Sequence, residues 1–430
     1  MTKPIFLPAS KPYSAEAVLK LVQDHPLSNE LETFDYGTAG FRYNAKLLPG
    51  VMVRVGFVAA IRAYQSQQAV GVMVTASHND ESYNGVKVAD PDGGMLQDEA
   101  LAIEIANERN LDHLRLRLEA LLEDCKPNNT TPGMVHLGRD TRSHSAELSD
   151  LTCQAILAMG VAVLQHGVVT TPMLHHAVLH SNSQYLPLHI PIRPNRSGYI
   201  NLLAQAYVSL LDTILDKNTS PELSPLIIDG ACGVGYGAVQ ELIAAIQELS
   251  PNSGRGRIFQ VMNGPGDGPL NEGCGSEVVQ KKLQPPTWYQ TETDGSSYMT
   301  PPWYAASLDG DADRIVFFSQ LPTFQLVDGD KIAVLICEFL QEQMECLYQS
   351  QPFIPRLSLG VVQTAYANGA STKYLQVWAE EVMHRIAQQR KPQKCCSCAP
   401  FVQCCSTIRF ALVSCVLLFY FRVGWVKPTF

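Results

Sequence analysis

The chain has 430 residues, of which 46% are hydrophobic and 17% charged, a balance typical of a globular protein with sizeable buried sheets. This length predicts two to four domains, because a single core rarely grows so large. A net charge of −9, from 32 basic and 41 acidic residues, argues against nucleic acid as a partner. The first residues, Met1–Ile5, lack the apolar stretch of a secretion signal, so the expected location is cytoplasmic.

The cysteines divide the chain into two parts. Six of the 12 lie singly within residues 1–394, mostly in apolar surroundings, and we interpret them as buried thiols of a reducing compartment. The other six crowd into residues 395–430. The apolar run Phe410–Phe421 is well short of the roughly 20 residues that a spanning helix needs, which disfavours membrane attachment. We expect the Cys-rich tail, residues 377–430, to be disordered.

The predicted elements begin with a β-α-β rhythm. Helices are predicted over Val51–Tyr64, Asp98–Leu122 and Ser145–Met159. Strands are predicted over Gly71–Val74, Met134–Gly138 and Val161–Leu164, with a turn at Thr170–Pro172. Because strands and helices alternate, the expected fold is α/β with a doubly wound parallel sheet.

The same rhythm returns twice later in the chain. Further strands are predicted over Pro225–Gly230, Ala305–Leu308, Ile315–Phe318 and Ser358–Val362, and further helices over Ala238–Leu249 and Lys331–Leu347. The glycine-rich loop Ala231–Gly237 has neither the Gly-x-Gly-x-x-Gly order nor a Walker lysine, so we interpret it as a tight turn and not as a nucleotide site. With polar or Pro-rich linkers at Ser181–Asn201 and Gln284–Pro302, the pattern indicates three related α/β units.

A serine follows the most apolar strand of the chain. Val70–Val74 is an unbroken run of small or apolar residues, which predicts a strand buried on both faces. Ser77 lies just beyond it, at the carboxyl edge where open α/β sheets bind ligands. His78 and Asn79 can donate hydrogen bonds to an anion there. For a Ser-His pair taken alone, a polar loop after a core strand is the competing interpretation.

Three aspartates alternate with small residues near position 310. Asp309, Asp311 and Asp313 can converge on one hard cation if the backbone bends tightly, and oxygen ligands of this kind suit Mg²⁺. An EF-hand is excluded because its sixth position would be Arg314 and its twelfth Gln320. A haloacid-dehalogenase-type Asp-x-Asp nucleophile and a solvated acidic turn remain as alternatives. Three like charges so close repel one another unless a cation neutralises them.

The two loops together indicate a phosphoserine site. A phosphate oxygen on Ser77 would complete the coordination of Mg²⁺ held by the three aspartates, and the metal would withdraw charge from the phosphoryl group. The loop Tyr36–Arg42 is a candidate phosphate cradle, or else a glycine turn with a surface arginine. Lys87 and Arg139 are further cations at strand or loop ends. His78 either relays a proton from a sugar hydroxyl or only donates a hydrogen bond.

Three motifs resemble, in this order, those of the α-D-phosphohexomutases, and within that superfamily the phosphoacetylglucosamine mutase branch. They are Tyr36–Arg42, Thr75–Asn79 and Asp309–Arg314. The stretch Gly360–Thr372 is similar to the same branch, and the resemblance covers roughly residues 30–376. It implies three similar α/β domains: residues 1–190 with the phosphoserine loop, residues 191–300, and an incomplete third domain, residues 301–376, with the metal loop. We expect the fourth domain of the family, which is α+β, to be missing from this chain.

The resemblance also implies an activity and a set of site residues. Members of the branch interconvert N-acetylglucosamine 6-phosphate and N-acetylglucosamine 1-phosphate, on the route to UDP-N-acetylglucosamine. Carried over by motif, the ligands of Mg²⁺ are Ser77, Asp309, Asp311 and Asp313. The residues that line the transfer site are Arg42, His78, Lys87 and Arg314. The implied partner is a small phosphosugar, with phospho-Ser77 as the phosphoryl donor.

Two loops of the family pattern are not found in this sequence. One reads the sugar hydroxyls in the third domain, and the other binds the substrate's non-reacting phosphate in the fourth. Such remote contacts supply binding energy and orientation, which account for much of the barrier reduction in enzymes. A catalytically silent isoform, which binds metal or phosphosugar or pairs with full-length chains, is therefore a second hypothesis. A haloacid-dehalogenase-like phosphatase is a third.

Overall fold

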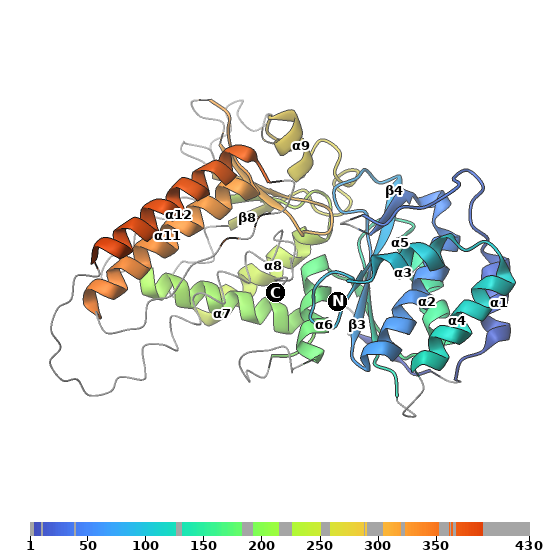
Figure 1. Ribbon diagram of the computed structural model, residues 1–430. Coiled ribbons are helices and arrows are strands. Elements are labelled where there is room, and N and C mark those ends of the chain that lie inside the picture. Colours follow the sequence, from blue (N-terminus) through green and yellow to red (C-terminus); the bar gives the residue numbers. More distant parts are fainter. Residues whose placement is uncertain are drawn as a thin grey trace. The chain divides into compact units, whose positions relative to one another are not determined.

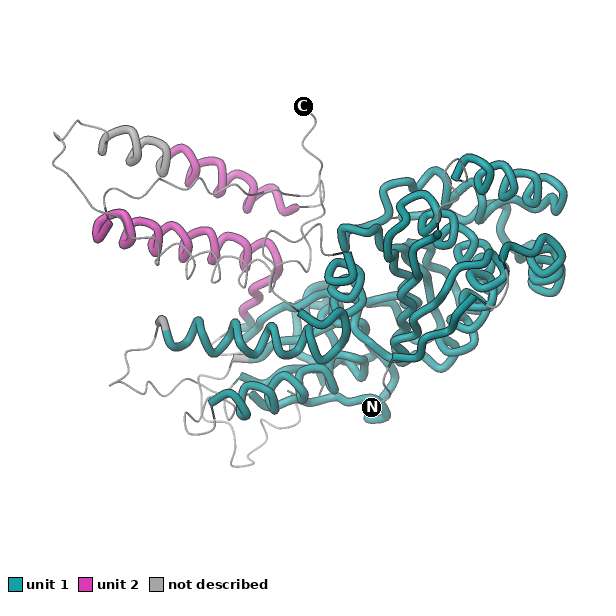
Figure 2. Tube along the Cα trace, turned by 90° about the horizontal axis from the view of Figure 1, so that it is seen from below, with its two compact units in different colours: residues 1–324 teal, residues 325–430 magenta. Residues whose placement is uncertain are grey.

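The computed structural model divides the chain into two compact units, residues 1–324 and 325–430 (Figure 2). It describes residues 4–9, 12–37, 40–125, 131–182, 192–214, 226–250, 259–287, 289, 304–319, 323–351, 361, 363 and 367–389. The predicted strand Ser358–Val362 and the Cys-rich residues 395–430 lie outside this part of the chain almost entirely. Thr38 and Ala39 of the first motif, and residues 360, 362 and 364–366 of the later one, also lie outside it.

The first sheet is mixed, not parallel as the sequence predicts. Its strands are β1 (Ile5–Leu7), β2 (Phe41–Asn44), β3 (Val70–Val74), β4 (Tyr83–Ala89), β5 (Val135–Arg139) and β6 (Val163–Val168), in the order β1-β6-β5-β3-β4-β2. Strands β3, β5 and β6 are parallel, whereas β4 returns antiparallel between β3 and β2, and β1 is antiparallel to β6. The loop from β3 to β4 is too short for a crossover connection, so the chain has to return antiparallel.

Strand β3 lies at the centre of the first domain, and every residue of Val70–Val74 is buried. This confirms the prediction of a strand covered on both faces. Figure 1 shows α2 and α5 on one side of β3 and α6 on the other. The helices of this domain are α1 (Ala15–Asp24), α2 (Pro49–Ser66), α3 (Glu99–Asn107), α4 (Leu111–Cys125), α5 (Ser145–Ala158) and α6 (Thr171–Ser181), with a 3₁₀ turn, η1, at Ala45–Leu47.

The predicted long helix Asp98–Leu122 is wrong, because the chain breaks it into α3 and α4. Two tertiary contacts hold the break. Buried Arg54 donates from Nε to the carbonyl oxygen of Glu108 (3.1 Å). The side chain of Asn107 pairs with the backbone of Phe34, accepting from its N–H (2.6 Å) and donating to its carbonyl oxygen (2.9 Å). These partners satisfy polar groups at the end of α3, so the helix need not continue.

Three other boundaries also differ from the predictions. Thr170 is the N-cap of α6, accepting from the N–H of Met173 (3.3 Å), so the predicted turn starts a helix. Helix α7 (Arg196–Ile214) begins inside the predicted linker Ser181–Asn201. Helix α8 (Val234–Leu249) begins inside the predicted loop Ala231–Gly237. Of these three helices, α8 starts after Gly233 without a side-chain cap, and a start of this kind is difficult to predict from sequence.

The second sheet carries the aspartate motif. Its strands in this unit are β7 (Leu226–Asp229), β8 (Phe259–Met262), β9 (Tyr304–Leu308) and β10 (Ile315–Ser319), in the order β10-β9-β7-β8. Strand β7 is parallel to β8 and β9, and β10 is antiparallel to β9. Helix α9 (Ser276–Lys282) packs against β9 and β10. The boundary expected at residue 300 therefore falls inside one sheet, because sequence does not show which sheet a strand joins.

The second unit holds β11 (Gln325–Val327), α11 (Gly329–Ser350) and α12 (Gly369–Gln389). Helices α11 and α12 lie side by side (Figures 1 and 2), and the N–H of Asn368 donates to Asp330 (3.0 Å). Helix α11 confirms the predicted helix Lys331–Leu347. Residues 377–389, which the sequence places in a disordered tail, belong to α12.

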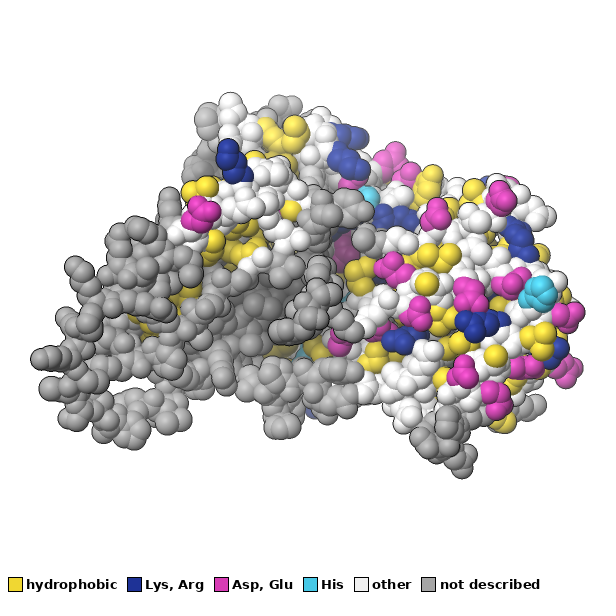
Figure 3. Space-filling view, viewed as in Figure 1, with side chains coloured by type: hydrophobic (Ala, Val, Ile, Leu, Met, Phe, Trp, Pro, Cys, Tyr) yellow, Lys and Arg dark blue, Asp and Glu magenta, His cyan; other side chains and the backbone are white. Residues whose placement is uncertain are grey.

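The described surface shows two further features. No helix among the described residues is long and apolar enough to cross a membrane. Over the domain that carries α1–α5, acidic and basic side chains are interspersed on the face shown in Figure 3.

A buried histidine pair joins β5, β6 and the end of α6. His136 Nδ1 lies 2.8 Å from His166 Nε2, and Ser181 Oγ lies 3.1 Å from His136 Nε2. Burial lowers the pKa of His136 to about 3 and that of His166 to about 4, so both rings are neutral at pH 7. Protonating either ring disrupts a contact that needs one donor and one acceptor.

The histidine pair predicts acid-labile stability. Because the unfolded rings titrate near pH 6.5, stability is present above that pH and falls as pH drops toward 4, by about 1.4 kcal/mol per pH unit and group. Chemical denaturation between pH 7.5 and 4.5 measures this slope. His166→Gln should reduce the slope by about one proton, whereas exposed His113→Gln should leave it unchanged. Equal slopes in wild type and His166→Gln would contradict the assignment.

Candidate active site

Ser77 has an unusual backbone conformation. Its side chain is 2% exposed and its φ is 52°, in the left-handed region that non-glycine residues rarely adopt. The N–H of Ser77 donates to Thr75 Oγ1 (3.0 Å). Its carbonyl oxygen accepts from Asn271 Nδ2 (2.9 Å) and Arg142 Nη2 (3.3 Å). The same two donors reach the carbonyl oxygen of Asn79, at 2.9 and 2.6 Å. Two side chains thus clamp the loop from outside it.

Arg142 is itself fixed by a buried carboxylate. Its guanidinium pairs with Asp140, and both side chains are fully buried. Asp140 also accepts from Ser145 Oγ at the start of α5. A buried pair of this kind needs its remaining hydrogen-bonding capacity satisfied, and the carbonyl oxygens of the Ser77 loop provide part of it. The Arg142 half of the clamp is therefore anchored within the first domain.

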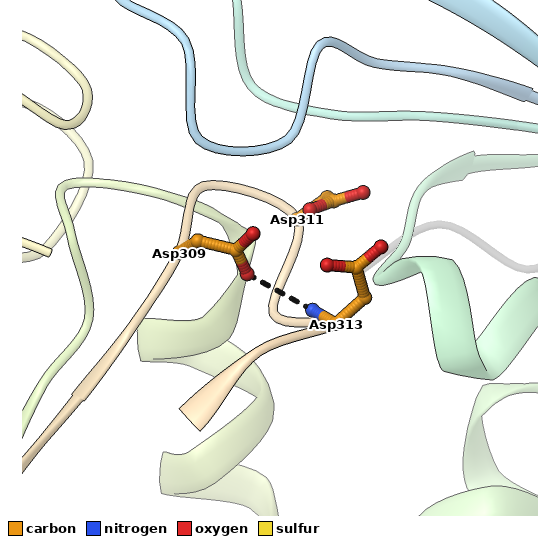
Figure 4. A group of neighbouring side chains, drawn as sticks. All are labelled: Asp309, Asp311 and Asp313. Carbon is orange, nitrogen blue, oxygen red and sulfur yellow. Dashed lines mark hydrogen bonds between the residues drawn. The ribbon is translucent and has the colours of Figure 1, made fainter. Parts of the chain in front are cut away.

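The aspartate motif forms a tight turn between β9 and β10 (Figure 4). Asp309 Oδ1 accepts from the N–H groups of Asp313 (3.1 Å) and Arg314 (3.0 Å), which closes the turn. Ala312 has a left-handed φ of 54°. The three carboxylates offer oxygen atoms that all lie within 4.8 Å of one another. The convergence expected from the spacing of the motif is confirmed.

The carboxylate oxygens differ in their partners: those of Asp309 and Asp313 all have protein partners, whereas Asp311 has a partner on only one oxygen. Lys87 Nζ donates to Asp311 Oδ2 (3.3 Å) and to Asp313 Oδ2 (3.0 Å). Thr171 Oγ1 also donates to Asp311 Oδ2 (2.6 Å). Ser77 Oγ faces the remaining oxygens of the other two residues, 2.6 Å from Asp309 Oδ2 and 3.3 Å from Asp313 Oδ1.

The remaining oxygen of Asp311, Oδ1, is buried without a hydrogen-bond partner. Burial raises the pKa of Asp309 and of Asp311, and the neighbouring carboxylates raise both further. For Asp313, burial acts in the same direction, but Lys87 and Arg314 outweigh it and lower the pKa. An orphaned oxygen in a crowded acidic cluster fits a hard divalent cation, for which carboxylates are the preferred ligands. Asp309, Asp311 and Asp313 can hold such an ion.

A second group of charges surrounds His78. Arg42 Nη1 donates to Asn79 Oδ1 (3.0 Å) and lies 3.4 Å from His78 Nε2. Glu277 on α9 lies between His78 (4.0 Å) and Arg314 (3.7 Å). Burial, followed by the charges of Arg314 and Arg42, lowers the pKa of His78 to about 3. The imidazole is therefore neutral at pH 7, and the nearby guanidinium groups disfavour its protonated form.

The structure brings all eight predicted site residues into one cluster. They are Arg42, Ser77, His78, Lys87, Asp309, Asp311, Asp313 and Arg314. Arg139 does not join them, and donates to the carbonyl oxygen of its neighbour Asp140 (3.4 Å). Sequence reasoning missed Asn271, Glu277 and Thr171, because isolated residues in loops and at helix starts carry no spacing signal.

The cluster depends on a close approach of two backbones at Gly310. A Cβ at this position would lie 2.8 Å from the carbonyl oxygen of Ser77 and 2.9 Å from Asn271 Nδ2. Only glycine lets the turn of the second sheet reach the loop of the first at this distance.

Gly310→Ala should therefore destabilise the protein, by about 1–3 kcal/mol, because the clash pushes the two loops apart. Thermal unfolding measures the change. Gly237→Ala is the matched control. Gly237 lies in helix α8, and a Cβ there would meet only the side chain of Arg196, at 3.7 Å. Alanine there should stabilise the helix slightly. Equal unfolding temperatures for Gly310→Ala and wild type would show that the approach is not tight.

Known proteins match the chain over both units. The family model described as phosphoglucomutase/phosphomannomutase, alpha/beta/alpha domain I, matches residues 47–112 and 104–198. A second, described as phosphoacetylglucosamine mutase AMG1, domain III, matches residues 328–388, so the resemblance continues past residue 376. The human phosphoacetylglucosamine mutase is 36% identical over 373 residues, which is 85% of this chain. The chain belongs to the phosphoacetylglucosamine mutase family.

Other family members match to a similar extent. The mutase of Saccharomyces cerevisiae is 36% identical over 375 residues. An N-acetylphosphoglucosamine mutase of Aspergillus fumigatus, solved with GlcNAc-6P and magnesium, is 33% identical with a TM-score of 0.69, covering 86% of this chain and 65% of that one. An N-acetylglucosamine-phosphate mutase in its substrate complex is 34% identical with a TM-score of 0.71, covering 84% and 65%. The chain spans 62% of the human relative and 64% of the yeast one.

The aspartate cluster predicts that Mg²⁺ stabilises the folded chain. At about a hundredfold excess over Kd, the gain in free energy of unfolding should be about 2.7 kcal/mol, and a chelator should remove it. Thermal unfolding with and without Mg²⁺ measures the gain. Asp311→Asn should weaken the effect because it removes the charge of the unpartnered oxygen, whereas exposed Asp24→Asn should preserve it. An unchanged response of Asp311→Asn would exclude Asp311 as a ligand.

Proposed function

We propose that this chain carries the phosphoryl-transfer centre of a mutase that interconverts N-acetylglucosamine 6-phosphate and N-acetylglucosamine 1-phosphate, for UDP-N-acetylglucosamine synthesis. One observation carries the proposal. Ser77 Oγ donates to Asp309 Oδ2 and Asp313 Oδ1, the two carboxylate oxygens that a phosphate on Ser77 would face across a bound cation. A relative named as this mutase was solved with GlcNAc-6P and magnesium, which supports the same substrate class and metal for this chain.

Phosphorylation of Ser77 accounts for a metal requirement. The serine hydroxyl donates a hydrogen bond to the carboxylates, whereas the oxygen of a phosphoserine carries no hydrogen and cannot donate one. Its phosphate then faces Asp309 and Asp313 as a like charge, which is unfavourable without a cation between them. Bound Mg²⁺ would neutralise this charge and polarise the phosphoryl group. In the proposal, Asp309, Asp311 and Asp313 hold the ion, together with the phosphate on Ser77.

The surrounding residues divide the remaining tasks of the transfer. The bond from phosphorus to Ser77 Oγ breaks as a bond to a sugar hydroxyl oxygen forms, and the hydroxyl proton ends, overall, on Ser77 Oγ. His78 either relays this proton or only donates a hydrogen bond, and its lowered pKa favours the second role. Lys87 stays protonated, because Asp313 and Asp311 outweigh the effect of burial and raise its pKa. Arg42 and Arg314 add positive charge where the phosphoryl group passes. The bisphosphorylated sugar then returns its other phosphate to Ser77.

A catalytically silent isoform is the second candidate. The chain spans less than two thirds of the length of the relatives named as mutases. That this chain itself turns over the substrate is therefore a proposal. The phosphatase hypothesis is weaker. Asp309 is fully buried, with Oδ1 accepting two backbone N–H groups and Oδ2 facing Ser77, which leaves no oxygen free to attack a substrate.

Turnover of N-acetylglucosamine 6-phosphate by the full chain, primed with a hexose bisphosphate, separates these candidates. Turnover within about tenfold of a four-domain relative would support the mutase and exclude the silent isoform. Ser77→Ala should then reduce it by at least ~10³-fold, because the phosphoryl carrier is lost. Ser82→Ala, an exposed serine of the same loop, should keep full turnover.

Two other outcomes would overturn the mutase. Absent turnover in a folded chain that still gains stability from Mg²⁺ would establish the silent isoform. Phosphate release that survives Ser77→Ala but not Asp309→Ala would establish the phosphatase.

A further inference from the structure

Two cysteines lie together beside the candidate site and have no part in the proposed transfer. Cys232 follows β7 and Cys274 precedes α9, and the thiol of Cys274 donates to Cys232 Sγ across 3.9 Å. They are 6% and 3% exposed. Among the other free thiols of the described chain, Cys153 is also buried and Cys346 is exposed.

A shared carboxylate holds the two cysteine loops side by side. Buried Asp229 accepts from the N–H of Ala231 (3.0 Å), next to Cys232, and from the N–H of Gly275 (2.7 Å), next to Cys274. The two sulfur atoms therefore face each other because one anchor positions both backbones. A disulfide needs a separation of about 2.05 Å, so the sulfurs have to approach by roughly 2 Å.

Both loops also bear directly on the candidate site. Asn271, three residues before Cys274, donates to the carbonyl oxygens of Ser77 and Asn79. On the other loop, the N–H of Val234 donates to the carbonyl oxygen of Gly310 (3.0 Å). A Cβ on Gly233 would lie 2.4 Å from that same oxygen, so the two backbones are in close contact here. Movement of either cysteine is thus transmitted to the Ser77 loop or to the aspartate turn.

We propose that Cys232 and Cys274 form a redox-active dithiol that a peroxide closes to a disulfide, shifting the two loops that support Ser77 and the aspartate turn. The Cys232 thiolate attacks one peroxide oxygen, the O–O bond breaks, and Cys232 becomes a sulfenic acid with release of water. Cys274 then attacks the Cys232 sulfur and releases a second water. Overall, two thiols lose two electrons and two protons, and one hydrogen peroxide becomes two water molecules.

Local contacts favour Cys232 as the attacking sulfur. It accepts from the Cys274 thiol and from the N–H of Gly268, and it lies just before helix α8, whose N-terminus favours negative charge. Gly268, next to Cys232, belongs to the exposed segment Pro265–Pro269, so Cys232 lies close to the surface. Burial nevertheless raises the pKa of both thiols, so closure should be slow at pH 7 and faster at pH 8.5.

The test treats the folded full chain with hydrogen peroxide, blocks free thiols, and maps the digested peptides by mass spectrometry. We expect one peptide pair joined through Cys232 and Cys274, with loss of two hydrogens, reversed by dithiothreitol. Cys274→Ser should leave Cys232 as a sulfenic acid, and Cys153→Ser should leave the crosslink intact. A crosslink that forms only in denaturant, or never at doses that oxidise Cys346, would overturn the proposal.

The coupling to the site has its own readout. Hydrogen exchange of the Thr75–Asn79 amides should become at least about tenfold faster after closure, because Asn271 no longer holds two carbonyl oxygens of the loop. Cys274→Ser treated in the same way should show no change. Unchanged exchange in the crosslinked wild type would overturn the coupling. Neither readout uses mutase turnover, so a failure of this inference is distinct from a failure of the proposed function.

Discussion

The concentration of negative charge in one buried turn is the constraint on which the rest of the site depends. Asp309, Asp311 and Asp313 offer oxygen atoms within 4.8 Å of one another, and Asp309 and Asp311 are fully buried, where like charges repel most strongly. Lys87 and Arg314 offset part of this repulsion. The Ser77 hydroxyl offsets another part by donating to two of the three residues. Each group around the turn is placed so that the charge can be tolerated.

The scaffold meets this constraint by joining two sheets at their carboxyl edges. The first sheet supplies Ser77 and Lys87, and the second supplies the aspartates. Glycine at position 310 allows the edges to touch, and Asn271 and Arg142 hold the serine loop from both sides. The carboxyl edges of open α/β sheets are common ligand sites, but here two of them share one site. The phosphoserine chemistry proposed for the chain follows from that shared edge.

The sequence predicts the chemistry of the site better than the architecture around it. Spacing alone indicates the cation cluster, because alternating carboxylates on a tight turn have few other uses, and the strand before Ser77 is predicted from its unbroken apolar run. The mixed topology was not predictable in the same way. Strand β4 is antiparallel because a loop is short, and α3 ends where Arg54 and Phe34 provide partners distant in sequence. Asn271 was missed for the same reason: its role exists only after two loops meet.

The left-handed backbone at Ser77 has a consequence for how the protein is made. Its supports, Asn271 and Asp309, follow it in the chain by 194 and 232 positions. During synthesis the first sheet can form long before either support has left the ribosome. Until then the loop is restrained from within the first domain, by contacts that include Arg142, Thr75 and Arg42, and it lacks the contacts from Asn271 and Asp309. The reactive geometry of the serine is thus acquired last, when the second sheet arrives.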